Sequence, residues 1–282
     1  MCGIAGFVGD MPFNKLTQLW VDNEIRGTDA AGIALGNENI WISKAPATAS
    51  VLLLEIAGKV AERLQGTNRG LMHCRAATNG NPSVSENNHP ILSPNRIGML
   101  VHNGIVQPKT PRKGCSECDS EQLLMALEEK GLVKGMDEVG GMRAIGYVPL
   151  VKTEQDSNES VFLFRDYMTP LYLGEGDGFR AFSSRREGLE AIGCKTKALD
   201  PWVMYKLTST GLREWHRYER TQSDWQGWPG EMYDWQGLGY GPCERGKKGL
   251  TLAQLFRRSF KRSKKKGKYG DGLRLFTLTS GD

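Results

Sequence analysis

The sequence predicts an α+β fold in which β-sheets are stacked and helices cover their outer faces, followed by a C-terminal extension of different composition. Three observations lead to this prediction: nine short apolar or alternating runs, only two long segments with clear helical spacing, and a change of composition near Tyr218. Nine strands with fewer helices indicate large stacked sheets with the helices outside.

The predicted strands are bounded by Gly, Pro, Asn or Asp, the residues that end strands and form turns. They cover residues 2–8, 31–35, 39–43, 71–75, 97–102, 144–151, 161–165, 179–183 and 202–207. Helical spacing is clearest over residues 50–65 and 120–130. In the second of these helices, Ser120 is expected to cap the N-terminus and Gly131 to close the C-terminus.

Length and composition exclude several classes of protein. The 282 residues correspond to about two domains at roughly 150 residues each. With 39% hydrophobic and 24% charged residues, the chain is neither collagenous nor wholly disordered. Its most apolar stretch, residues 51–64, is interrupted by four charged residues, so no membrane span is expected. The N-terminus lacks the features of a secretory signal, and we expect a cytoplasmic protein.

The six cysteines indicate reduced thiols rather than a disulfide framework, because they are scattered through a chain without an export signal. Cys115 and Cys118 have a C-x-x-C spacing that can hold zinc. A structural zinc site needs four ligands, and no second pair supplies the other two, so a plain loop is favoured over a metal site.

The extension differs from the preceding 218 residues in both composition and charge. The tetrapeptide DWQG occurs at 224–227 and again at 234–237, which indicates either a locally packed loop or a docking surface. Residues 243–282 carry twelve Lys or Arg against three acidic residues, a net charge of +9 that leaves −4 for the rest. A short amphipathic segment at 250–260 precedes the basic run at 261–268, which we expect to be solvated. We therefore divide the chain into a domain at 1–218 and an extension at 219–282.

Cys2 is the first candidate for catalysis. Removal of Met1 would place a thiol and a free α-amine on one residue. The α-amine has a reference pKa of about 7.7 to 8.0, so it can accept the thiol proton near neutral pH. A buried, unreactive cysteine on the first strand is the alternative.

Five blocks of sequence favour the catalytic role of Cys2: CGIAG at 2–6, RGTDAAGI at 26–33, HCRAATNG at 73–80, VHNGI at 101–105 and CDSE at 118–121. Together and in this order they resemble the class II glutamine amidotransferases, a family of N-terminal-nucleophile glutaminases. Five blocks in order are far more specific than one short motif. Further matches are RD at 165–166, PL at 170–171 and FSS at 182–184, so the resemblance covers roughly residues 2–210.

The resemblance implies a four-layer αββα sandwich and a γ-glutamyl thioester on Cys2. It assigns the oxyanion hole to the side-chain amide of Asn103 and the backbone N–H of Gly104. It assigns the α-carboxylate of glutamine to Arg75, which can bind it bidentately, and the α-ammonium to Asp119. A surface ion pair is the alternative role for Arg75 and Asp119.

The remaining site assignments also follow from the resemblance. Arg26 is expected to order the surroundings of the N-terminal cysteine, and Thr78 and Asn79 to contact the bound amino acid. The sequence departs from the family pattern at Ala76, where many members carry an aromatic residue, and at Asn79. The histidines beside these blocks are not needed as bases, because the α-amine serves that purpose.

The predicted function is therefore glutamine hydrolysis that supplies ammonia to an acceptor, with no cofactor and no metal. The roughly 64 residues of the extension are too few and too polar for a synthase domain, so a separate synthase or acceptor protein is the expected partner. The alternatives are an amidohydrolase for another γ-glutamyl-like amide and a noncatalytic binding protein that keeps the fold. Nucleic acid binding by the basic tail is not favoured, because few aromatic residues are interleaved with its lysines.

Overall fold

The structure is a computed structural model that describes residues 1–37, 39–112, 116–151, 159–219 and 276–278. Two sheets form its centre, and all of their strand pairs are antiparallel. The first sheet has eight strands in the order β11 (Lys195–Ala198), β9 (Tyr172–Glu175), β10 (Phe179–Ser183), β1 (Gly3–Gly9), β4 (Arg69–Arg75), β2 (Ala30–Leu35), β3 (Trp41–Ala45) and β14 (Phe276–Leu278). The second has six strands in the order β13 (Gly211–Arg217), β12 (Val203–Thr208), β8 (Val161–Arg165), β7 (Val139–Pro149), β6 (Gly98–Pro108) and β5 (Ile91–Leu92).

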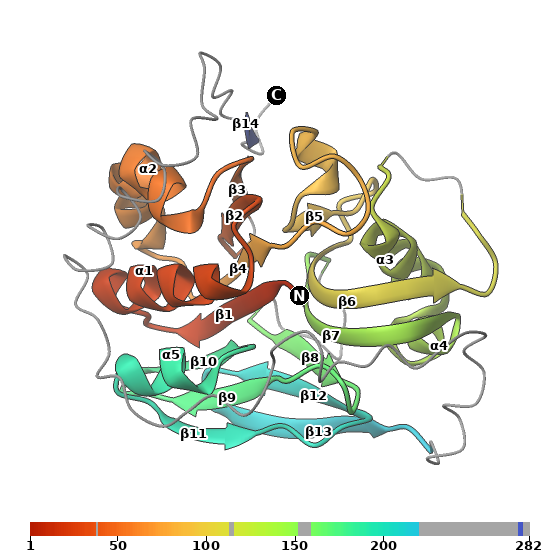
Figure 1. Ribbon diagram of the computed structural model, residues 1–282. Helices are drawn as coiled ribbons and strands as arrows, with labels where there is room; N and C mark the ends of the chain where they lie inside the picture. The colour runs from red at the N-terminus through yellow and green to blue at the C-terminus, as the bar shows by residue number, and fades with distance from the viewer. Residues whose placement is uncertain (38, 113–115, 152–158, 220–275, 279–282) are drawn as a thin grey trace, which may run out of the picture.

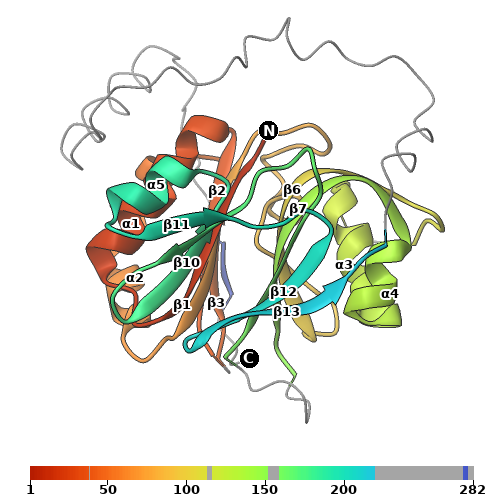
Figure 2. The ribbon, with the colours of Figure 1, turned by 90° about the horizontal axis from the view of Figure 1, so that it is seen from below.

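Helices cover the outer face of each sheet, as Figure 2 shows. The eight-stranded sheet carries α1 (Phe13–Asp22), α2 (Ala49–Leu64) and α5 (Arg186–Ala191), and the six-stranded sheet carries α3 (Asp119–Lys130) and α4 (Leu132–Asp137). Two short 3₁₀ helices, η1 (Asn23–Arg26) and η2 (Ser85–Asn87), lie in connections. The predicted four-layer αββα arrangement is confirmed (Figures 1 and 2).

Strand β1 shows how the layers are held together, because all seven of its residues are buried. Ala5 and Phe7 pack in the core under α1 and α2, whereas Ile4 and Val8 pack in the core between the two sheets. This alternation is the period of two expected for a strand with a covered face on either side. Burial on both faces makes β1 a rigid support for the residue that precedes it, Cys2.

The two sheets approach each other closely around the ring of Phe182. A Cβ atom added at Gly6 would lie 2.4 Å from this ring, and one added at Gly146 would lie 2.6 Å from it. Neither position can therefore carry a side chain without moving the ring. Glycine in β1 and in β7 thus allows one phenylalanine to fill the space between the sheets.

The predicted helix cap at Ser120 is wrong. Helix α3 begins at Asp119 with Cys118 as its N-cap residue, and no side chain caps it. Ser120 is buried in the first turn, where its hydroxyl contacts His102 instead of the helix backbone. The predicted C-terminal closure at Gly131 is correct, because this residue is the C-cap with φ of +78°.

Most of the predicted extension lies outside the described residues. Both DWQG repeats, the amphipathic segment at 250–260 and the basic run at 261–268 belong to this part of the extension. Cys115, which precedes the extension, also lies outside the described residues. Residues 276–278 are described, and β14 pairs antiparallel with β3 so that Phe276 lies opposite Lys44. No helix in the described ranges is both long and apolar enough to cross a membrane.

Candidate active site

The N-terminus lies at the seam between the two sheets, next to the start of β1 and close to the paired strands β6 and β7 (Figures 1 and 2). Cys2 is partly buried, and its Sγ lies 3.5 Å from the carbonyl oxygen of Ala76. Arg26 in η1 donates from Nε to the carbonyl oxygen of Cys2 at 2.8 Å. The predicted nucleophile and the predicted ordering residue are therefore in direct contact.

The electrostatic surroundings of the Cys2 thiol act in opposite directions. Burial is the largest influence and raises the pKa of the thiol, while the positive charges of the chain terminus, Arg75 and Arg26 each lower it. An α-amine on Cys2 itself would lie closer to the sulfur than the amine of Met1 does. Removal of Met1 would therefore bring the proton acceptor to the thiol that needs it.

The second and third sequence blocks pack against each other beside Cys2. A Cβ atom at Gly27 would lie only 2.3 Å from the carbonyl carbon of Arg75, so this position requires glycine. Asp29 donates from its backbone N to the carbonyl oxygen of Arg75 at 3.0 Å, and its Oδ2 accepts a bond of 2.9 Å from the backbone N of Ala77. These contacts fix the segment that follows β4.

Asn103 and Gly104 lie in the middle of β6. Asn103 is fully buried, and neither atom of its side-chain amide has a hydrogen-bond partner among the described residues. Gly104 has φ of +142°, and a Cβ atom there would lie 2.0 Å from the carbonyl oxygen of Met142. A buried amide without a partner costs free energy, so this amide is placed to bind an atom of a ligand.

Asn103 and Gly104 are connected to the start of β1 through β4, by strand pairing and one hydrogen bond. Gly3 lies opposite Cys74, and Ile4 lies opposite His73 on β4. His73 donates from Nε2 to the carbonyl oxygen of His102 at 3.2 Å, and His102 directly precedes Asn103. The chain thus brings the first and fourth sequence blocks to one place.

Arg75, at the end of β4, is only 3% exposed. Its Nη1 donates to Oδ1 of Asn88 at 2.9 Å, and its Nη2 donates to the carbonyl oxygens of Asn79 and, at 3.1 Å, Gly80. All three acceptors are neutral. Thr78 and Asn79 have exposed side chains in the loop that Arg75 holds, so their predicted contacts to a bound amino acid remain predictions.

Asp119 links α3 to the strand of the oxyanion residues. Its Oδ2 accepts a bond of 2.7 Å from the backbone N of Val106 on β6. The next residue, Ser120, contacts Nδ1 of His102 through its hydroxyl at 2.7 Å. Through these two bonds the first turn of α3 is fixed to β6 on both sides of Asn103 and Gly104.

Three buried histidines lie beneath the site. The rings of His73 and His89 stack with centroids 4.3 Å apart, and the rings of His89 and His102 meet edge to face at 6.4 Å. Burial lowers the pKa of His73 to about 3 and also lowers the pKa values of His89 and His102. The three rings are therefore neutral near pH 7 and pack as polar core residues.

The structure also places two residues at this site that the sequence analysis missed, Asn88 and Lys44. Asn88 contacts Arg75, and its carbonyl oxygen accepts a bond of 2.9 Å from Nζ of Lys44. No local pattern marks either residue, since Asn88 belongs to an irregular connection and Lys44 is a single charge in a strand. Only the tertiary contacts identify them.

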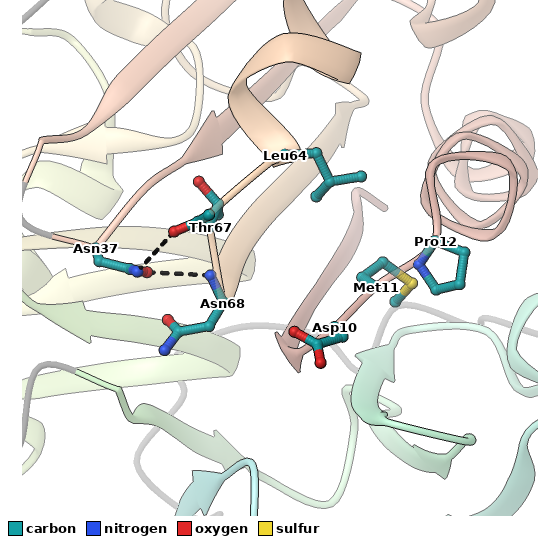
Figure 3. Close-up of a pocket in the computed structure, with 8 residues that line it drawn as sticks. Asp10, Met11, Pro12, Asn37, Leu64, Thr67 and Asn68 are labelled. Carbon is teal, nitrogen blue, oxygen red and sulfur yellow. Dashed lines mark hydrogen bonds between the residues drawn. The ribbon is translucent and has the colours of Figure 1, made fainter.

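A pocket lies at the other end of β1 from Cys2, just after Gly9. It contains none of the predicted site residues (Figure 3). Its lining includes Asp10, Asn37 and Asn68. The Oδ1 of Asn37 accepts a hydrogen bond of 3.2 Å from the backbone N of Asn68. Within the ranges that the structure describes, no group of three or more His, Cys, Asp or Glu side chains is arranged to hold a metal ion.

Comparison with curated proteins finds glutamine–fructose-6-phosphate aminotransferases among the relatives of this chain. The chain is 35% identical over 200 residues to a glutamine–fructose-6-phosphate aminotransferase (isomerizing) of Caldanaerobacter subterraneus subsp. tengcongensis, which covers 63% of this chain and 30% of the relative. A protein of the same name from Oceanobacillus iheyensis is 28% identical over 203 residues, which cover 65% of this chain and 32% of the relative. The match thus spans about a third of these relatives' length. No family model matches the chain.

Solved structures agree in fold. The glutamine phosphoribosylpyrophosphate amidotransferase of B. subtilis, in complex with ADP and GMP, aligns with a TM-score of 0.56 and 17% identity over 78% of this chain and 50% of that chain. A structure described as the allosteric regulatory enzyme of purine biosynthesis aligns with a TM-score of 0.58 and 16% identity over the same shares.

The stacked antiparallel sheets and their helical layers therefore have the same fold as part of these amidotransferase structures. The sequence relationship and the five ordered blocks make this part of the chain similar to class II glutamine amidotransferase domains.

Proposed function

We propose that this domain hydrolyses the side-chain amide of glutamine through a γ-glutamyl thioester on Cys2 and supplies the ammonia to a separate acceptor enzyme. The observation that carries the proposal is the buried side-chain amide of Asn103, next to Gly104 on β6, which has no hydrogen-bond partner among the described residues. The names of the curated relatives, which describe transfer of nitrogen from glutamine, support the same reaction class.

In the proposed reaction, Met1 is removed and the α-amine of Cys2 accepts the proton of Sγ. The thiolate adds to the side-chain carbonyl carbon of glutamine, and the oxyanion that forms accepts hydrogen bonds from Nδ2 of Asn103 and the N–H of Gly104. The C–N bond then breaks, the proton held by the α-amine passes to the leaving nitrogen, and ammonia departs. Water adds to the thioester, the C–S bond breaks, and glutamate and the free thiol are released.

The two charged groups of glutamine would bind to side chains of opposite charge. The guanidinium of Arg75 would bind the α-carboxylate and the carboxylate of Asp119 the α-ammonium. Arg75 is bonded only to neutral acceptors, which leaves its charge available for an anion.

Intact mass before and after treatment with an electrophilic glutamine analogue tests the proposal. We expect loss of the mass of Met1 and addition of one analogue, and no addition to Cys2→Ala. Cys194→Ala is the matched control, because this buried thiol lies beyond α5, away from the site. Equal release of glutamate by the native chain and Cys2→Ala would refute the mechanism. Labelling of Cys2 without hydrolysis of glutamine would favour an amidohydrolase for another γ-glutamyl amide.

A further inference from the structure

Asn88 has the densest set of polar contacts around Arg75. It is 1% exposed and follows η2 in the connection between β4 and β5. Its Oδ1 accepts from Nη1 of Arg75 at 2.9 Å, and its Nδ2 donates to the carbonyl oxygens of Pro82 at 2.7 Å and Val84 at 3.4 Å. Because both ends of the amide are bonded, the side chain has one orientation, with the oxygen toward the guanidinium.

Two cations share this one residue. The carbonyl oxygen of Asn88 accepts from Nζ of Lys44, while its side chain accepts from Arg75. Within the described ranges, no carboxylate forms an ion pair with either cation. Burial lowers the pKa of Lys44 to about 8, and the nearby carboxylate of Glu86 only partly opposes this effect.

The chemical type of the residue at position 88 therefore matters. A carboxylate of the same size would form a charge-assisted pair with Arg75 and neutralise it. An amide oxygen holds the guanidinium in place while its positive charge stays available to a ligand.

We propose that Asn88 is a positioning residue that sets the specificity of the site for amino acids with a free α-carboxylate, by orienting Arg75 without neutralising it. The inference rests on the proposed function, which assigns the α-carboxylate of glutamine to Arg75. It adds that selection between substrates with and without this group depends on a residue that does not itself contact the substrate.

The test is Asn88→Asp, which changes the charge at position 88 with almost no change in shape. The matched control is Asn81→Asp, which places the same charge in the same loop. The Oδ1 of Asn81 accepts only from the backbone N of Ser83, at 2.9 Å, a contact that a carboxylate also makes. Three quantities are measured for each full-length variant: kcat/KM for L-glutamine, kcat/KM for 4-aminobutanamide, which is glutamine without its α-carboxylate, and the affinity for L-glutamate by calorimetry.

We expect Asn88→Asp to lower kcat/KM for glutamine by about 10- to 100-fold, mainly through KM, and to weaken L-glutamate binding by a similar factor. The value for 4-aminobutanamide should stay within about threefold of the native one, because this substrate has no carboxylate for Arg75 to bind. Asn81→Asp should resemble the native chain with both substrates.

Three outcomes would overturn the inference. One is a folded Asn88→Asp variant with native kcat/KM for glutamine, and another is an equal loss for both substrates, which would indicate general damage to the site. The third is an equal loss in Asn81→Asp, which would indicate a long-range effect of charge. If the native chain binds L-glutamate but does not hydrolyse glutamine, the proposed function fails, and weaker L-glutamate binding by Asn88→Asp still supports the inference.

Discussion

Nδ1 of His102 and the hydroxyl of Ser120 lie 2.7 Å apart, and both side chains are buried. The bond joins β6 to the first turn of α3, so it connects the strand of the proposed oxyanion residues to the helix that carries Asp119. A serine that the sequence assigns to the helix cap thus holds together two parts of the candidate site.

We expect Ser120→Ala to lower the free energy of unfolding by about 1 to 3 kcal/mol, because it leaves a buried ring nitrogen of His102 without a partner. Urea unfolding measures the change. Ser83→Ala is the matched control, because Ser83 is exposed and should give a change within about 0.5 kcal/mol. Equal stability of the two variants would show that the bond contributes nothing.

The strongest test of substrate binding changes Arg75 and Asp119. Arg75→Lys should raise KM for glutamine at least about tenfold, because a point ammonium cannot reproduce a bidentate contact to a carboxylate. Asp119→Asn should raise KM through loss of the partner of the α-ammonium. Steady-state kinetics separate KM from kcat, and unchanged KM in both folded variants would place the pocket elsewhere.

Asn103→Ala should act on a different kinetic constant. If Nδ2 of Asn103 donates to the oxyanion, its loss should lower kcat by about 10²-fold or more, with little change in KM. The fold should be retained, because the side-chain amide has no partner within the described part of the chain that the substitution would leave unsatisfied. A native kcat would remove Asn103 from the oxyanion hole.

The histidine cluster makes stability depend on pH. An unfolded histidine has a pKa of about 6.5, whereas burial lowers that of His73 to about 3 and those of His89 and His102 below their usual value. Between these values the unfolded chain binds more protons than the folded chain, so the free energy of unfolding falls as pH falls below 6.5. Each fully shifted histidine contributes a slope of up to about 1.4 kcal/mol per pH unit.

Urea unfolding at several pH values between 6.5 and 5 measures this slope, and NMR of the imidazole protons follows the rings directly. The ring of His73 should remain neutral at pH 5, and the rings of His89 and His102 should titrate below the usual range of a histidine. Titration of all three with midpoints near 6.5, or stability that does not change over this range, would contradict the prediction.

The sequence predicts the layers of this fold better than it predicts its edges. All nine predicted strands are present, and two of them, β8 and β10, have the predicted bounds. Five strands of the structure are absent from the prediction. Four of them, β5, β9, β11 and β13, are short or partly exposed, so their sequences lack a strong alternating pattern. Helix α1 was also missed, because it begins after Pro12 without a side-chain cap and has no acidic residue in its first turn.

The candidate site could be predicted where a block of sequence carries its chemistry and not where tertiary contacts create it. Cys2 and Arg26 belong to separate blocks, and the bond between them follows from the packing of η1 against β1. Asn88 carries no local signal, because its importance depends on a guanidinium thirteen residues away. Ser120 was assigned to the cap because the position suits a cap, whereas the buried ring of His102 offers it a better partner.

The extension is tested by two deletions. Removal of residues 276–282 takes away β14 and its pairing with the edge strand β3, so we expect a lower melting temperature with unchanged glutamine hydrolysis. Removal of residues 219–282 should have the same effect on stability and also spare hydrolysis, because every proposed catalytic and binding group lies at or before Asp119. The longer deletion alone should lower delivery of ammonia to the acceptor, since it removes the tryptophan-rich repeats that we expect to dock a protein partner.

Glutamate release, melting temperature and acceptor product are measured for both deletions. Loss of hydrolysis in a folded deletion would show that the extension completes the pocket. Binding of DNA by the full chain that weakens steeply with salt, and that is absent from the longer deletion, would assign the net charge of +9 to nucleic acid instead.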